Sequence, residues 1–351
     1  MKPFIAITAL AMAAPNGLDS VTVATSVWSD ITRVSSPLVS GRTFDPLTLG
    51  AIPDQCFFPL KPEVGQGRNL SPLESRLIGL AGLLEPEVNA IRLPGSVSPH
   101  FIVGLPDTLD RPEEIAALMA KQLGLNTSHS MALPIGRAAG LMAVHEACRM
   151  IESGSADIVI AGGIDSYNDI DLLGILHSRS RIKADIGQDQ FIPGEGACLV
   201  CLMAEQKARA SGLTYPMRIL SSARGFEPGH IHGPVPCLGT GLSETLREVF
   251  TRAKGQHKPV KAVFSSMNGE SFWAREWGMA FIRNMDSFHD KVATNHPAQC
   301  YGDPGAAAGP LMIGCALKGY EYNYFDGPAI VYASSDGGER AAVLLDGGPN
   351  E

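Results

Sequence analysis

The sequence has no run of lysine and arginine and no long apolar stretch. Its 351 residues carry a formal net charge of -8, so nucleic acid is not an expected partner, because binding to phosphates requires clustered positive charge. The same balance leaves basic partners open. No stretch approaches the ~20 apolar residues of a membrane-spanning helix, so no membrane is expected as a partner either.

Cysteine is sparse, and its placement argues against a metal site. The seven cysteines are an odd number, and most stand in apolar segments. Cys198 and Cys201 form the only C-x-x-C pair, and no second pair completes a zinc site. We therefore expect no metal, no cofactor and a reducing, cytoplasmic location.

The first residues, MKPFIAITALAMAAP, allow one alternative. A single lysine, an apolar run and small residues also resemble a secretory signal peptide. The run is short and passes directly into Pro15, Asn16 and Gly17, which is typical of a core strand that ends in a turn. We expect the strand.

Apolar segments alternate with helical patterns along the chain, which predicts an α/β protein with buried, mostly parallel sheets. With 45% hydrophobic and 18% charged residues, the chain can bury a large core. Strands are expected at residues 4–10, 100–105, 157–162, 197–203, 217–222, 260–267, 329–334 and 341–345.

Two kinds of helix are expected. Segments 135–153 and 305–318 are rich in Ala, Gly and Leu, so we expect them side by side in the core, packed on nearly every side. Segments 111–123 and 242–254 are amphipathic, so one face of each should meet water.

The order of elements repeats loosely before and after about Lys207, which indicates an internal duplication. We predict two halves, at residues 1–206 and 207–351. Residues 38–94 are proline-rich and are expected to form an irregular excursion over the surface.

Five motifs follow one another over most of the chain: "ITALAMAAPNGL", "HEACRMIESGSADIVIAGG", "GEGACLVCLMAEQKARASG", "GDPGAAAG" and "SSDGGERAAVLL". In this order they resemble the ketosynthases, or beta-ketoacyl synthases, of the thiolase superfamily. The resemblance implies a thiolase-like α/β fold with two similar halves in a five-layer αβαβα arrangement.

The resemblance also implies where the chemistry would lie. The family uses a cysteine at the N-terminus of a buried helix and two histidines from the second half. Arg137 stands at the position of the cysteine, Asn268 and Asp303 at those of the histidines, and Asp336 close to that of a gating phenylalanine. Guanidinium stays protonated and offers no lone pair for attack on a thioester. No catalytic residue and no condensing activity are therefore expected.

A buried arginine at a helix N-terminus opposes the helix dipole and needs a carboxylate partner. We predict that Arg137 is buried and bonded to Asp303, Asp336 or both. Arg137 would then be the centre of a structural or ligand-binding polar cluster.

Two other groups of residues have a functional and a structural interpretation. His230, His232 and Cys237 could ligate a metal, but no fourth ligand is near in the sequence, which favours a solvated loop. Trp273 and Trp277 stand one helical turn apart, which favours core packing over an exposed interface anchor.

A third group is His296, Cys300 and Asp303 in "HPAQCYGD". These residues could form a new thiol site. Their spacing fits no helix face, which favours a buried cysteine beside a turn.

Three functions stay open. The segments "NGESFWAREWG" and "CYGDPGAAAG" resemble most a degenerate ketosynthase subgroup encoded near bacterial type VI secretion genes. That resemblance implies a non-catalytic partner, adaptor or assembly factor for a secretion effector or adaptor protein. The second function is a chain-length-factor-like subunit in fatty-acid, polyketide or aryl polyene synthesis, and the third is an acyltransferase with altered chemistry.

Residues 197–203 are apolar on both faces. The resemblance implies that this strand forms a sheet edge, which pairs with the same strand of a second subunit across a two-fold axis. We therefore expect a homodimer, or a heterodimer with a ketosynthase-like subunit.

Overall fold

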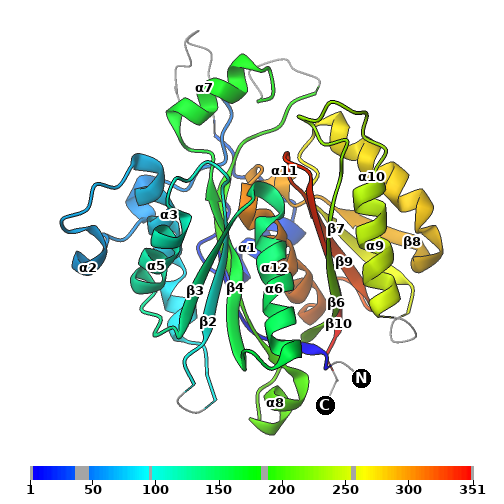
Figure 1. Ribbon diagram of the computed structural model, residues 1–351, viewed down its shortest axis with the longest axis horizontal. Coiled ribbons are helices and arrows are strands. Elements are labelled where there is room, and N and C mark those ends of the chain that lie inside the picture. Colours follow the sequence, from blue (N-terminus) through cyan, green and yellow to red (C-terminus); the bar gives the residue numbers. More distant parts are fainter. Residues whose placement is uncertain (1–2, 36–46, 95–96, 183–188, 254–257, 349–351) are drawn as a thin grey trace.

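The computed structural model describes residues 3–35, 47–94, 97–182, 189–253 and 258–348 (Figure 1). Within these residues the strands pair in the order β3-β2-β4-β5-β1-β6-β10-β9-β7-β8. The strands are β1 Ile5–Ala13, β2 His100–Leu105, β3 His129–Pro134, β4 Ile158–Ser166, β5 Glu195–Ala204, β6 Met217–Phe226, β7 Val260–Ser265, β8 Phe288–Asn295, β9 Ala329–Ser334 and β10 Glu339–Gly347. The α-helices are α1 Ser20–Trp28, α2 Pro62–Gly65, α3 Pro72–Leu83, α4 Glu85–Asn89, α5 Pro112–Gln122, α6 Ala139–Ser153, α7 Ile170–Ser178, α8 Glu205–Ala210, α9 Thr240–Arg252, α10 Ser271–Arg283, α11 Ala298–Tyr301 and α12 Ala308–Glu321. Short 3-10 turns are η1 Asp54–Cys56, η2 Gly136–Ala138, η3 Met285–Ser287 and η4 Gly305–Ala307.

The strand order is the same in both halves. From its outer edge inward, the first half has the order β3-β2-β4-β5-β1 and the second half the order β8-β7-β9-β10-β6. In both halves this is the third, second, fourth, fifth and first strand along the chain. The parallel and antiparallel pairings also correspond one to one. The expected two similar halves are confirmed, while the boundary at residues 206 and 207 stays a prediction.

The sheets are mixed, so the expectation of mostly parallel sheets is wrong. In each half the two outer pairings are parallel, and the pairings of the fourth with the fifth and the fifth with the first strand are antiparallel. The cause is visible in the second half, where only the turn at residues 335–338 joins β9 to β10. Two neighbouring strands joined by so short a turn can only be antiparallel, because parallel neighbours need a long crossover connection.

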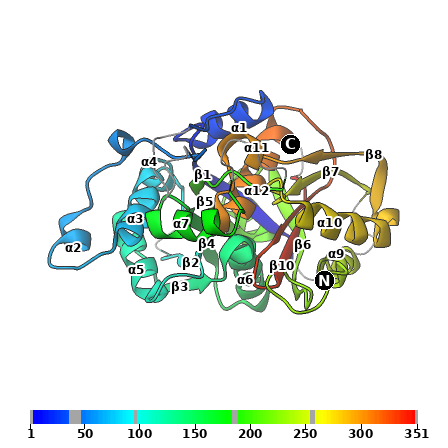
Figure 2. The ribbon, with the colours of Figure 1, turned by 90° about the horizontal axis from the view of Figure 1, so that it is seen from above.

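Helices and sheets alternate in five layers (Figures 1 and 2). The largest core cluster joins α6 and α12 to the inner faces of both half-sheets. A second cluster packs α3 and α5 on the outer face of the first half-sheet, and a third packs α9 on the outer face of the second. The predicted pair of central helices and the two amphipathic outer helices are therefore confirmed.

Glycine allows the two central helices to approach closely. A Cβ atom on Gly140 of α6 would lie 2.3 Å from the carbonyl oxygen of Ala306, and one on Gly309 of α12 would lie 2.3 Å from Cγ of Leu141. Each helix also begins with a 3-10 turn whose first residue is a glycine at positive φ, 75° for Gly136 and 51° for Gly305. The two helix starts therefore meet at the centre of the molecule.

The strand at residues 197–203 is not a sheet edge, which corrects one expectation. It forms part of β5, which pairs with β4 on one side and β1 on the other. The outermost strands are β3 and β8, and the sequence predicted neither. Both are partly exposed and carry polar residues such as His129 and Asp290, so neither has the apolar run that marks a buried strand.

The segment at residues 38–94 is not an irregular excursion throughout. Residues 38–46 lie outside the described residues, but α3 is an ordered helix whose Leu77, Ile78 and Leu80 are buried. Ser71 caps this helix in a reciprocal bond with Glu74, which fixes where it starts. Within the described residues, no helix has the length and apolar character needed to cross a bilayer.

Replacing Gly140 by alanine should destabilise the fold by about 1–3 kcal/mol, the usual range for an overpacked core. The new methyl group would meet the backbone of η4, which cannot move without shifting α12. Urea unfolding followed by circular dichroism measures the change. The matched control is Gly278→Ala on α10, where a Cβ meets nothing within 4 Å; equal losses in both variants would contradict the packing argument.

Candidate functional site

Arg137 lies in η2, directly before α6, and is only 3% exposed. Its Nε and Nη2 atoms both lie 2.8 Å from Oδ2 of Asp303. Its Nη1 atom donates to the carbonyl oxygen of Ser334 at 3.1 Å and to Oδ1 of Asp336 at 3.2 Å. The predicted burial of Arg137 and its pairing with both carboxylates are confirmed.

Asp303 is held in place from three sides. Its Oδ1 accepts from the backbone N–H of Gly305 at 3.0 Å, and its Oδ2 accepts from the amide of Asn268 at 2.8 Å as well as from Arg137. The backbone of Asp303 exchanges hydrogen bonds with Ile192 and Gly194. The structure thus brings Arg137, Asn268, Asp303 and Asp336 into one buried cluster, which we call the polar cluster.

A second guanidinium group completes the polar cluster. Arg181 donates to both oxygens of Glu270, at 2.7 and 2.8 Å, and to Oδ2 of Asp336 at 2.5 Å. Asp336 therefore bridges two arginines. Burial alone would raise the pKa of Asp336, but the charges of Arg137 and Arg181 outweigh it and bring this pKa to about 2. The carboxylate is ionised at neutral pH.

Three backbone N–H groups at the starts of the central helices are bonded to side chains. The N–H of Ala138 donates to Oγ of Ser335 at 2.8 Å, and that of Ala306 donates to Oδ2 of Asp165 at 2.8 Å. The N–H of Gly305 is bonded to Asp303. Free N–H groups at a helix start are what stabilise an oxyanion, and these three are already engaged within the protein.

Asp165 is itself unusual, because it is a carboxylic acid that is 5% exposed. Burial raises the pKa of Asp165 to about 7, although the N–H groups of Ala306 and Ser166 favour its ionised form. It lies close enough to Asp303 for the two negative charges to repel.

A second buried ion pair lies beside the polar cluster. Arg340, which is fully buried, donates from Nε to Oε1 of Glu276 at 2.7 Å, and Ser334 donates to the other oxygen at 2.7 Å. The ring of Trp273 lies 4.9 Å from the guanidinium carbon of Arg137 and 5.7 Å from that of Arg340. Trp273 is therefore a buried spacer between two cations, a position that cation–π attraction favours.

The interpretation of the tryptophan pair as core packing is confirmed. Trp273 is 3% exposed and donates from Nε1 to Oε2 of Glu270 at 3.0 Å. Trp277 is partly buried and stacks on Tyr332, with ring centroids 4.7 Å apart.

The structure places Cys237 with Glu227 and Glu276 rather than with the two histidines. One donor atom of each lies within 4.8 Å of the others, so the three could reach one ion. Glu276 is already paired with Arg340, and Glu227 accepts from the N–H of Gly241 at 2.7 Å. Burial raises the pKa of Cys237 to about 11. Two of the three donor residues are therefore already engaged within the protein, and the Cys237 thiol is protonated at neutral pH.

The possible thiol site at Cys300 does not form. Cys300 is fully buried, and burial raises its pKa to about 11, so the nucleophilic thiolate is not populated at neutral pH. The Nδ1 atom of His296 instead lies 2.6 Å from Oγ of Ser265. The preferred interpretation, a buried cysteine beside a turn, is confirmed.

A cavity of about 320 Å³ lies beside the polar cluster. It is lined by Met267, Asn268, Gly269, Glu270, Ala274, His296 and Gln299. Asn268 and Glu270 therefore separate the buried charges from this open space.

Sequence reasoning missed Arg181, Glu270 and the pair Arg340 and Glu276. Glu270 stands two residues after Asn268 in "MNGES", so its position carried a local signal. Arg181 stands shortly after α7 and far in the sequence from its partners Glu270 and Asp336, and the sequence gives no local signal for those contacts.

Comparisons with known proteins agree with the fold. Residues 101–208 match the model of the beta-ketoacyl synthase N-terminal domain. The chain is 35% identical to the phthioceranic/hydroxyphthioceranic acid synthase of Mycobacterium bovis over 106 residues, which are 28% of this chain and 5% of that protein. It is 29% identical to the 3-oxoacyl-[acyl-carrier-protein] synthase 2 of Rhizobium meliloti over 178 residues, or 46% of this chain and 39% of that protein.

Solved structures extend the likeness to the whole chain. The oxazolomycin ketosynthase domain of Streptomyces albus superposes with a TM-score of 0.82 at 16% identity, over 99% of this chain and 76% of that one. The ishigamide ketosynthase/chain length factor superposes with a TM-score of 0.80 at 15% identity, over 99% of this chain and 100% of that one. The expected thiolase-like α/β fold is confirmed.

Replacing Arg137 by alanine should destabilise the protein by about 3 kcal/mol, because Asp303 would remain buried without its cation. Chemical denaturation at pH 7 measures the loss. Arg149→Ala is the control, since the Arg149 side chain is 58% exposed and its pair with Glu146 on the same helix should contribute no more than about 0.5 kcal/mol. Similar losses for both variants would contradict the role assigned to Arg137.

The raised pKa of Asp165 predicts a pH dependence of stability. Asp165 keeps its proton in the folded protein up to its raised pKa of about 7, whereas the unfolded chain releases it near the usual aspartate pKa of about 3.9. The contribution of Asp165 should therefore fall as pH rises from 4 to 7 and stay level above. We expect the unfolding free energy of the wild type minus that of Asp165→Asn to decrease over this window; a flat or rising difference would contradict the assignment.

Proposed function

We propose that this chain, whose fold and whose residues 101–208 are beta-ketoacyl synthase-like, is a non-catalytic protein that acts as a partner, adaptor or assembly factor. The observation that carries the proposal is the ion pair of Arg137 with Asp303 at the start of α6. By resemblance this is the position of the nucleophilic cysteine. A paired guanidinium there has no lone pair to offer a thioester.

Three further features support the loss of condensing chemistry. Asn268 and Asp303, at the proposed histidine positions, are bonded to each other and supply no imidazole. Asp336 has entered the region of the proposed gate and is tied to Arg137 and Arg181. The backbone N–H groups of Ala138 and Ala306 are also bonded to side chains. We treat these four residues, Arg137, Asn268, Asp303 and Asp336, as degenerate active-site positions.

The proposed partner is a secretion effector or adaptor protein of a type VI secretion system, in the cytoplasm. The support is the resemblance of "NGESFWAREWG" and "CYGDPGAAAG" to that degenerate subgroup. These segments hold α10 and the turn before η4, and they supply Asn268, Glu270, Trp273 and Asp303 to the polar cluster.

We also propose that the chain assembles as a dimer through β3 rather than through residues 197–203. β3 is hydrogen-bonded to β2 and is the last strand of the ordered sheet on that side. An open edge is a template for a strand of another chain. The pairing strand would come from a second copy or from a ketosynthase-like subunit.

The second candidate is a chain-length-factor-like subunit. It is favoured by the likeness of the fold to the ishigamide ketosynthase/chain length factor. Co-expression separates the two candidates. Stable co-purification with an effector and its spike protein supports the adaptor, whereas co-purification with an intact ketosynthase supports the subunit.

Purified protein should not elongate an acyl thioester with malonyl carrier protein, and Arg137→Cys should not restore the reaction, because Asn268 and Asp303 provide no imidazole for the decarboxylation step. Mass spectrometry of the carrier protein measures the product, with an active ketosynthase as the positive control. Elongated product from the wild-type chain would overturn the proposal.

A further inference from the structure

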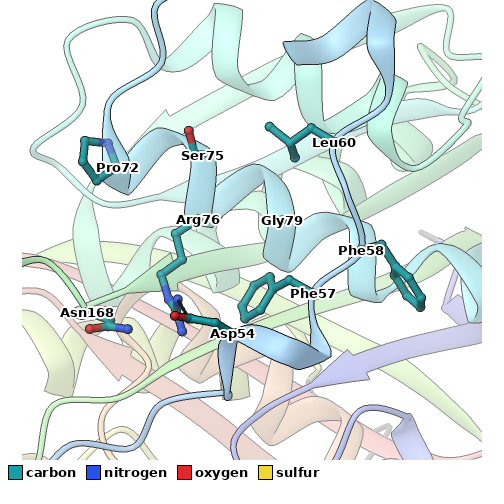
Figure 3. A pocket seen from close by; sticks show the side chains of 9 residues that line it. All are labelled: Asp54, Phe57, Phe58, Leu60, Pro72, Ser75, Arg76, Gly79 and Asn168. Carbon is teal, nitrogen blue, oxygen red and sulfur yellow. Dashed lines mark hydrogen bonds and ion pairs between the residues drawn. The ribbon is translucent and has the colours of Figure 1, made fainter. Parts of the chain in front are cut away.

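A pocket on the outer side of α3 belongs to no part of the polar cluster. Its volume is about 380 Å³. The residues that line it are Asp54, Phe57, Phe58, Leu60, Pro72, Ser75, Arg76, Gly79 and Asn168 (Figure 3). The walls are mostly apolar, and the polar groups gather at one end, where Arg76 reaches down from α3 toward Asp54 and Asn168 (Figure 3).

The charges at this end do not cancel. Arg76 donates from Nε and Nη2 to the two oxygens of Glu195, at 2.6 and 2.7 Å, and the Glu195 side chain is fully buried. That pair is neutral. Asp54 accepts from Nη1 of Arg76 at 2.8 Å through Oδ1, and its side chain is 90% exposed. Asp54 therefore adds one negative charge at the mouth of the pocket.

Two phenylalanines, Phe57 and Phe58, line the pocket and have different surroundings. Phe57 lies against α3, where a Cβ on Gly79 would come within 2.8 Å of its ring, and the guanidinium carbon of Arg76 lies 4.7 Å from its centroid. Phe58 is 55% exposed and lies farther from Asp54, beyond Phe57 (Figure 3). The ring of Phe57 is the one that lies beside Asp54 (Figure 3), and an aromatic ring beside a surplus carboxylate attracts an organic cation.

We propose that this pocket binds an arginine or lysine side chain from a basic segment of a partner protein. The alkyl stem would lie along Phe57 and Leu60, and the cationic head would meet Asp54. The whole chain carries a net charge of -8, which also favours a basic partner. This inference rests on the proposed function, in which the chain acts by binding another protein.

The pocket is physically connected to the polar cluster. Glu195 accepts from Oγ of Ser166 at 2.7 Å, and the neighbouring Gly194 donates its N–H to the carbonyl oxygen of Asp303 at 2.8 Å. The floor of the pocket is thus fixed by the same backbone that holds Asp303. A side chain bound at Asp54 would meet a rigid surface, which lowers the entropic cost of binding.

The test is fluorescence anisotropy with the full chain and short labelled peptides that carry one central arginine, lysine, citrulline or glutamate among glycine and serine. Citrulline matches arginine in shape and lacks its charge. We expect the arginine and lysine peptides to bind at least about ten-fold more tightly than the citrulline peptide, as for one charge-assisted contact. Added salt should weaken that preference.

Two variants locate the binding. Asp54→Asn should abolish the preference for arginine over citrulline, whereas Asp110→Asn, the same change of charge at another exposed aspartate, should preserve it. Gly79→Ala should weaken the binding of both the arginine and the citrulline peptide, because the new methyl group pushes the ring of Phe57 into the pocket. Equal binding of arginine and citrulline, equal effects of the two aspartate variants, a preference for glutamate, or no binding at millimolar peptide would each overturn the proposal. If the pocket fails these tests while a partner still co-purifies, the proposed function stands and only its contact surface is wrong.

Discussion

A guanidinium group buried at the amino end of a helix requires anions, and most of the central architecture satisfies that requirement. Arg137 opposes the dipole of α6, so its charge must be neutralised nearby. Its partners Asp303, Ser334 and Asp336 all come from the second half of the chain. The pair therefore fastens the two halves at the point where α6 and α12 begin, and a change at Arg137 should be felt in both.

This arrangement is the physical basis of the proposed non-catalytic function. A site for nucleophilic catalysis needs an unpaired nucleophile and free N–H groups. In this cluster the guanidinium of Arg137 is paired with carboxylates, and the N–H groups of Ala138 and Ala306 are bonded to Ser335 and Asp165. Each substitution suits the others, since removing any one would leave a buried charge or donor unsatisfied. The surface, including the open edge of β3, remains available for partners.

The sequence was sufficient for the parts of the molecule that depend on local pattern. The central helices follow from their small residues, and the link of Arg137 to Asp303 and Asp336 follows from helix electrostatics combined with the family resemblance. The sequence was not sufficient for β3 and β8, because an exposed edge strand carries no apolar run, nor for the order of the sheet, which placed β5 in the interior. Arg181 was missed because only the path of the folded backbone brings it to Asp336.

The central claim is that Arg137 and Asp303 act as a coupled, buried ion pair that joins the two halves of the chain. A double-mutant cycle measures that coupling directly, from the unfolding free energies of the wild type, Arg137→Ala, Asp303→Ala and the double variant. The account predicts a coupling of about 2–3 kcal/mol, so that the double variant is far less destabilised than the sum of the single variants. A coupling below about 0.5 kcal/mol, the scatter expected for independent sites, would contradict it.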